Sequence, residues 1–181
     1  MKGLLLAVAL LAAVPAAVSQ EQDEMKPGLV AEFFNIGKQM EEFPAIPAER
    51  KPDYRRIDGQ INYEETAESF PGTQMSDHFY VRWTGKLKIP RDGKMTFFTE
   101  SDDGSRLWID GKLVVDNGGL HAMEEKSGEL DLKAGDHDLK IELFENDGDV
   151  GCKLSWESST MTKEILPESA LLHKKDKDLD K

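Results

Sequence analysis

A strict alternation of apolar and polar side chains runs through residues 79–89 and constrains the fold more than any other feature. Six residues fall on one face at two-residue spacing, and most of their neighbours are polar or charged: Phe79, Val81, Trp83, Gly85, Leu87 and Ile89. A β-strand points successive side chains to opposite faces of its sheet. The alternation therefore predicts a long strand with one face in a core.

Shorter stretches with the same alternation follow at intervals of roughly ten residues. Asp110-Gly111 separates two apolar runs, which is a strong signal for a tight hairpin. The expected strands cover residues 29–34, 95–99, 105–109, 112–115, 139–143 and 152–156. Many short strands joined by turns predict an all-β fold, an antiparallel β-sandwich or barrel.

Two stretches of the chain lack this pattern. Residues 44–71 combine scattered prolines with mixed charge, and we expect a long irregular excursion across the domain surface. Residues 173–181 consist almost entirely of Lys and Asp, which predicts a disordered charged tail whose deletion barely changes stability. The domain itself is then expected to span residues 28–172.

The N-terminus has the order of a secretory signal peptide. Lys2 precedes an apolar run over residues 4–14, and small residues such as Ala17 and Ser19 close the segment. The apolar run is too short to span a bilayer, which needs about 20 apolar residues. We therefore expect residues 1–19 to be removed, no membrane insertion afterwards, and a secreted, periplasmic or cell-surface location.

The charge of the chain limits its partners. The formal net charge of −12 disfavours binding to nucleic acid, whose phosphates repel an acidic surface. A hard cation is the more specific partner for acidic side chains, because its ligands are carboxylate and carbonyl oxygens. Cys152 is the single cysteine, so an internal disulfide is excluded and we expect a buried thiol.

Four separated motifs occur in the order found in one known family. They are residues 28–34 (GLVAEFF), 79–85 (FYVRWTG), 97–112 (FFTESDDGSRLWIDGK) and 116–121 (DNGGLH). Together they resemble the PA-fourteen family, the protective-antigen fourteen-kilodalton domain. The resemblance implies a β-sandwich of the type found in toxins, glycosidases, adhesins and bacterial exported proteins. In the adhesin branch it implies a calcium-dependent lectin.

The resemblance also implies a site. In the lectins of the family, the adjacent pair corresponding to Asp102 and Asp103 is joined by a cis peptide bond and binds calcium. The same pattern places an Asn side chain at Asn146 and backbone carbonyls near Gly148 and Val150. Asp102, Asp103 and Asn146 are then the expected contacts of a carbohydrate. The alternative is that Asp102 and Asp103 belong to an ordinary polar turn, for which Asp, Gly and Ser are usual residues.

These observations lead to one functional prediction with an alternative. We expect a non-catalytic, calcium-dependent carbohydrate-binding or adhesion-type module whose partner is a glycan or a glycosylated surface. The alternative is a metal-free protein-interaction or structural envelope domain. An enzyme is disfavoured, because the sequence shows no nucleophile elbow, phosphate-binding loop or paired zinc ligands.

Overall fold

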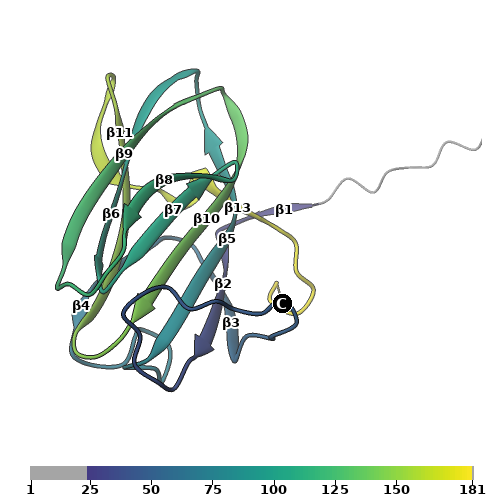
Figure 1. The fold of residues 1–181 in the computed structure, drawn as a ribbon. Helices are drawn as coiled ribbons and strands as arrows, with labels where there is room; N and C mark the ends of the chain where they lie inside the picture. Colours follow the sequence, from purple (N-terminus) through teal and green to yellow (C-terminus); the bar gives the residue numbers. More distant parts are fainter. Residues whose placement is uncertain (1–23, 181) are drawn as a thin grey trace, which may run out of the picture.

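The structure, a computed structural model, describes residues 24–180, so the predicted signal peptide lies outside the described residues. Over these residues the chain forms two antiparallel sheets that pack face to face, and a single 3-10 turn, η1 (Glu168–Ala170), interrupts the strands (Figure 1). The all-β prediction is confirmed as a sandwich, since the sheets are not closed into a barrel. Among residues 24–180 we find no helix with the length and apolar character of a membrane span.

The larger sheet contains eight of the described strands. Six follow the order β1-β13-β5-β10-β7-β8; in addition β2 pairs with β5, and β3 pairs with β2. Its strands are β1 (Met25–Pro27), β2 (Leu29–Asn35), β3 (Tyr54–Asp58), β5 (Phe79–Ile89), β7 (Ser105–Ile109), β8 (Lys112–Asn117), β10 (Gly135–Glu145) and β13 (Leu171–Lys174).

The smaller sheet contains five of the described strands, in the order β12-β11-β6-β9, and β4 also pairs with β11. Its strands are β4 (Asn62–Thr66), β6 (Gly93–Asp102), β9 (Glu124–Leu132), β11 (Val150–Ser158) and β12 (Met161–Ile165).

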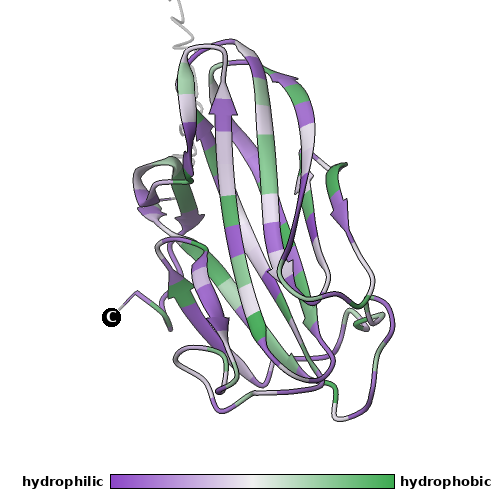
Figure 2. Ribbon diagram, turned by 90° about the vertical axis from the view of Figure 1, so that its left-hand side faces the viewer, coloured by the Kyte–Doolittle hydropathy of each residue, from purple (hydrophilic) through white to green (hydrophobic). Residues whose placement is uncertain are grey.

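The core lies between the two sheets and follows from the alternation along the strands. Apolar and polar positions alternate along the longest strands (Figure 2), and the inward residues are completely buried, among them Trp83, Phe97 and Ile141. Cys152 is buried among them as expected. Because β5 and β10 pair over eleven residues each, they hold the centre of the larger sheet in a fixed register.

The predicted irregular excursion over residues 44–71 differs from the structure, which places two strands inside it. β3 pairs with β2, and β4 pairs with β11. Both strands lie at sheet edges and most of their side chains are exposed or half-buried. A strand with no fully buried face shows no apolar alternation, which is why the pattern gave no sign of either strand.

The first part of the predicted disordered tail is ordered, because β13 extends to Lys174 and pairs with β1. His173 is 1% exposed, with Nδ1 at 3.2 Å from the Gly28 carbonyl and Nε2 at 3.2 Å from the Asp180 carboxylate. Asp176 accepts a hydrogen bond of 2.6 Å from Arg55 of β3. The C-terminal segment therefore folds back beside β3 (Figure 1).

These contacts reverse the expected effect of removing the tail. Truncation after Lys175 removes the partners of His173 and Arg55 and leaves polar atoms of a buried side chain without hydrogen bonds. We expect a loss of about 2 kcal/mol in the free energy of unfolding, and a melting temperature lower by about 5 °C.

Calorimetry of the truncated protein measures this loss. The matched control is Lys177→Ala, since Lys177 is exposed and its side chain makes no hydrogen bond within residues 24–180. An unchanged melting temperature after truncation would show that the C-terminal contacts add nothing to stability.

Candidate functional site

Three carboxylate side chains meet at one end of the sandwich, where strands of both sheets begin or end. Asp102 is the last residue of β6, and Asp103 leads into β7. Glu145 is the last residue of β10, which pairs with β7. The turn from β6 to β7 passes from one sheet to the other, so it brings the Asp pair against the end of β10.

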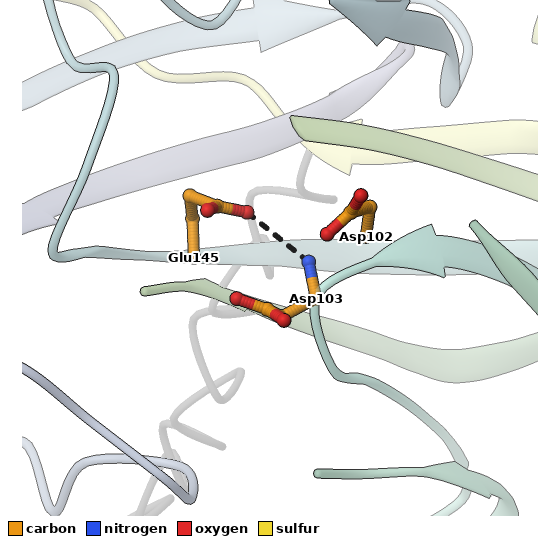
Figure 3. Close-up of side chains that lie close together, drawn as sticks. All are labelled: Asp102, Asp103 and Glu145. Carbon is orange, nitrogen blue, oxygen red and sulfur yellow. Dashed lines mark hydrogen bonds between the residues drawn. The ribbon is translucent and has the colours of Figure 1, made fainter. Parts of the chain in front are cut away.

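The carboxyl groups of Asp102, Asp103 and Glu145 lie close together and away from solvent. Each contributes an oxygen, and these oxygens all lie within 4.8 Å of one another. Asp102 is 7% exposed, Asp103 is 5% exposed, and Glu145 is completely buried. Figure 3 shows the side chains of Asp102 and Glu145 converging on the same space beside Asp103. The peptide bond between Asp102 and Asp103 is cis, as the family resemblance implies.

Backbone amides hold the Asp103 carboxylate in place. Its Oδ1 accepts a hydrogen bond of 3.1 Å from the backbone N–H of His121, and its Oδ2 accepts one of 2.9 Å from that of Asn146. The backbone N–H of Asp103 in turn donates to Oε2 of Glu145 at 3.1 Å (Figure 3). A carboxylate has about four lone-pair sites, so Asp103 keeps acceptor capacity for a further partner.

The proximity of these groups disturbs their protonation. Burial raises the pKa of Glu145 to about 9, and the negative charges of Asp103 and Asp102 add to the effect. Burial also raises the pKa of Asp102 to about 7, with further contributions from Asp103 and Glu65. Oε1 of Glu145 is buried and makes no hydrogen bond within the described residues. A buried oxygen without a partner is destabilising. A cation or a hydrogen-bonding group beside Oε1 would therefore stabilise this arrangement.

A hard dication fits this set of donors. Calcium is bound by carboxylate and carbonyl oxygens, and its charge offsets the repulsion among closely spaced carboxylates. Asp102, Asp103 and Glu145 supply such oxygens from strand ends that the core holds in place. The donor set contains no sulfur or imidazole, which are the ligands that zinc prefers.

The other predicted ligands lie beside the cluster in different settings. Oδ1 of Asn146 accepts a hydrogen bond of 2.7 Å from the backbone N–H of Met40, and so it is engaged outside the cluster. Gly148 donates its N–H to Asp77 at 3.4 Å. Val150 starts β11, one residue before Gly151, which is the register partner of Asp102. The loop is therefore adjacent to the Asp pair, and the amide oxygen of Asn146 is held by the backbone of Met40.

Glu145 is the member of the carboxylate cluster that the sequence interpretation did not include among the site residues. A signal for it exists, because Leu139, Ile141 and Leu143 alternate inward along β10 and the next inward position is Glu145. A carboxylate at an inward position is unusual unless it is paired or bound to a metal. Ser101 and Ser105, which flank the Asp pair in the sequence, are completely buried, and their hydroxyl groups form a hydrogen bond of 2.7 Å.

The fold and the site agree with the family assignment from known proteins. The sequence profile of the PA14 domain matches residues 25–170. The chain therefore belongs to the PA14 domain family, and the resemblance predicted from its motifs is confirmed.

Similar proteins include anti-sigma factors and a sugar-binding adhesin domain. The chain is 37% identical over 118 residues to the anti-sigma-I factor RsgI3 of Acetivibrio thermocellus, a match that covers 64% of this chain and 18% of that protein. It is 32% identical to a solved anti-sigma factor domain-containing protein, with a TM-score of 0.70 and coverage of 83% and 48%. The PA14 sugar-binding domain of an RTX adhesin shares the fold, with 19% identity, a TM-score of 0.71 and coverage of 81% and 98%.

The chain spans less than half of each anti-sigma protein that it matches. The names of these relatives describe regulators and a sugar-binding domain rather than catalysts, which agrees with the expectation of a non-catalytic domain. That expectation stays a prediction.

The same relatives correct the predicted localisation. The sequence interpretation places the protein among secreted, periplasmic or cell-surface proteins, because residues 1–19 have the order of a signal peptide. The anti-sigma relatives are regulators in which this domain is one part of a longer chain, so the prediction as made is wrong. A place at the cell surface is compatible with the similarity.

The raised pKa of Glu145 predicts how the metal-free protein responds to pH. The folded state keeps a proton on Glu145 up to a pH of about 9, whereas the unfolded chain loses it near the ordinary value of 4.5. The folded state therefore binds more protons between these values, and stability falls as pH rises through this window. Glu145→Gln stays neutral in both states, so it should flatten the profile and stabilise the protein near pH 9.

Melting temperatures measured in chelator from pH 4 to pH 10 test this effect. Glu49→Gln, at an exposed position, is the matched control and should keep the wild-type profile. Identical profiles for the wild type and Glu145→Gln would refute the proposed protonation of Glu145.

Proposed function

We propose that this domain is a non-catalytic, calcium-dependent carbohydrate-binding module. The observation that carries the proposal is the group of three buried carboxylates, Asp102, Asp103 and Glu145, with an unpaired oxygen on Glu145. Buried carboxylates without a nearby cation are destabilising, and the hydrogen bonds that hold Asp103 and Glu145 come from backbone N–H groups. A bound calcium ion accounts for the cluster.

Calcium would bind to Asp102, Asp103 and Glu145, with the loop of residues 146–150 supplying further oxygens. Calcium takes about 6–8 oxygens, so three carboxylates leave positions for backbone carbonyls near Gly148 and Val150 and for a ligand. The Asn146 side chain would join this shell only by giving up its bond to Met40. Its backbone N–H already supports Asp103.

A carbohydrate is the ligand that this arrangement favours. The hydroxyl groups of a sugar are neutral oxygen donors that can complete the coordination of calcium, while Asp102, Asp103 and Asn146 accept or donate hydrogen bonds around them. The shared fold of a PA14 sugar-binding domain from an adhesin supports this ligand class.

The anti-sigma relatives favour a sensing role for such binding. A domain that recognises a carbohydrate within a regulatory protein would report the presence of that carbohydrate to the rest of the chain. We assign only ligand recognition to this domain, because the match covers 18% of the anti-sigma-I factor.

Calcium should raise the thermal stability of the protein. A ligand that binds only the folded state at a hundredfold excess over Kd stabilises it by about 2.7 kcal/mol. For a domain of this size that corresponds to a rise of about 5–10 °C in melting temperature, which chelator should reverse. Asp103→Asn keeps the size of the side chain but removes a charge, and it should abolish most of the rise.

The matched control is Asp136→Asn. Asp136 is exposed at the opposite end of β10, where it lies across from Lys88 of β5 in the strand register. Removal of its charge should therefore leave the calcium effect unchanged. A glycan array with and without chelator then identifies the carbohydrate. If calcium and chelator leave the wild-type melting temperature unchanged, the metal-free interaction domain becomes the better description.

A further inference from the structure

A hollow of about 640 Å³ lies beside β2 and β3. It is lined by Asn35, Tyr54, Gly72, Thr73, Gln74 and Met75. None of these residues is charged, although 32% of the chain is Asp, Glu, Lys or Arg. Its volume falls within the range of about 300–1,000 Å³ that is typical of small-ligand sites.

Tyr54 supplies an aromatic surface to this hollow. Its side chain is 42% exposed, and within residues 24–180 Leu120 is the other large apolar residue with comparable exposure. The Tyr54 ring packs against Phe33 of β2, with 5.6 Å between the ring centroids. An exposed ring backed by the core is rigid, and it offers an apolar surface together with a hydroxyl group.

Polar groups around the ring are available for hydrogen bonding. The side-chain amides of Asn35 and Gln74 and the Tyr54 hydroxyl make no hydrogen bond with any residue of the 24–180 region. Each amide offers both a donor and an acceptor, which matches the two-way hydrogen bonding of sugar hydroxyls. The aromatic ring can stack on the face of a sugar ring, and the neutral amides can bind the hydroxyl groups at its edge. A peptide ligand would instead need a cluster of apolar side chains to anchor it.

The rim of the hollow is held in place by its own contacts. Oγ1 of Thr73 donates to the Phe70 carbonyl at 2.7 Å and accepts from the Met75 N–H at 3.1 Å. Arg56 donates to the Pro71 carbonyl at 2.6 Å. The backbone of the rim is therefore already ordered without ligand, which lowers the entropy cost of binding.

The hollow lies at the same end of the sandwich as the carboxylate cluster. Asn35 is the register partner of Phe79, and Phe79 is the register partner of Glu145. Two strand spacings separate Asn35 from Glu145, or roughly 10 Å across the sheet. A short oligosaccharide can extend over this distance.

We propose that this hollow is a second carbohydrate subsite, which takes a neutral sugar unit on Tyr54 and extends the site at the carboxylate cluster. As an extension it rests on the proposed function, but the binding of sugar to the hollow itself needs no metal. The ligand class is a neutral oligosaccharide long enough to reach both places.

NMR titration of the isotope-labelled protein tests the subsite directly. The probes are neutral hexasaccharides of glucose, xylose, mannose and galactose, each added in chelator and in calcium, with polygalacturonic acid as the charged comparison. At least one neutral probe should shift the side-chain amide signals of Asn35 and Gln74 and the ring signals of Tyr54 under both conditions. If no neutral probe shifts them, or if only polygalacturonic acid does, the subsite is refuted.

Two variants separate ring stacking from a general loss of structure. Tyr54→Ala should weaken binding of the responding probe about tenfold, while Tyr54→Phe keeps the ring and should lose much less. Equal affinities of Tyr54→Ala and the wild type would overturn the proposal.

The location of the shifts distinguishes this inference from the proposed function. Calcium-dependent shifts at Asp103 and Asn146 alone would support the calcium site and refute the Tyr54 subsite. Shifts at Tyr54 that are the same with and without calcium, with none at Asp103, would support the subsite and count against the calcium-dependent function.

Discussion

Burial of one continuous apolar core between two sheets is the constraint on which the rest of the structure depends. Trp83, Phe97 and Ile141 are completely buried, and each lies on a strand whose register is fixed by its neighbours. Because that register is fixed, the positions of the strand ends are fixed as well. The carboxylates of Asp102 and Glu145 are therefore held close together by the core, despite the repulsion between them.

The part of the fold that follows from local alternation could be predicted from the sequence. Residues 79–89 are an example, since each inward side chain there is apolar or small. β3 and β4 could not be predicted, because edge strands with exposed side chains carry no alternation. The Lys and Asp residues of the tail predict disorder, and they give no sign that His173 is buried. Its burial depends on contacts with Gly28 and Asp180.

The candidate site also contains residues that could be predicted from the sequence and residues that could not. Asp102 and Asp103 are adjacent in the chain, so a family motif is enough to identify them. Glu145 joins them only because β10 ends beside the turn between β6 and β7, and that proximity arises from pairing over long sequence distances. Asn146 is expected to contribute its side chain, and its amide oxygen accepts a hydrogen bond from the backbone of Met40, which lies in a segment without a recognisable pattern.

A buried network around Arg56 connects the core to the loop that borders the Tyr54 hollow. Arg56 donates to Asp58 at 2.6 Å, and Asp58 accepts a further hydrogen bond of 2.7 Å from the indole of Trp83. The guanidinium group lies over the Phe33 ring and also donates to the Pro71 carbonyl. The loop is thus anchored to the same residues that stabilise the core. A ligand that spans the hollow and the carboxylate cluster would meet two surfaces that lie at the same end of the sandwich and are already folded, so most of the ordering cost of binding would come from the ligand itself.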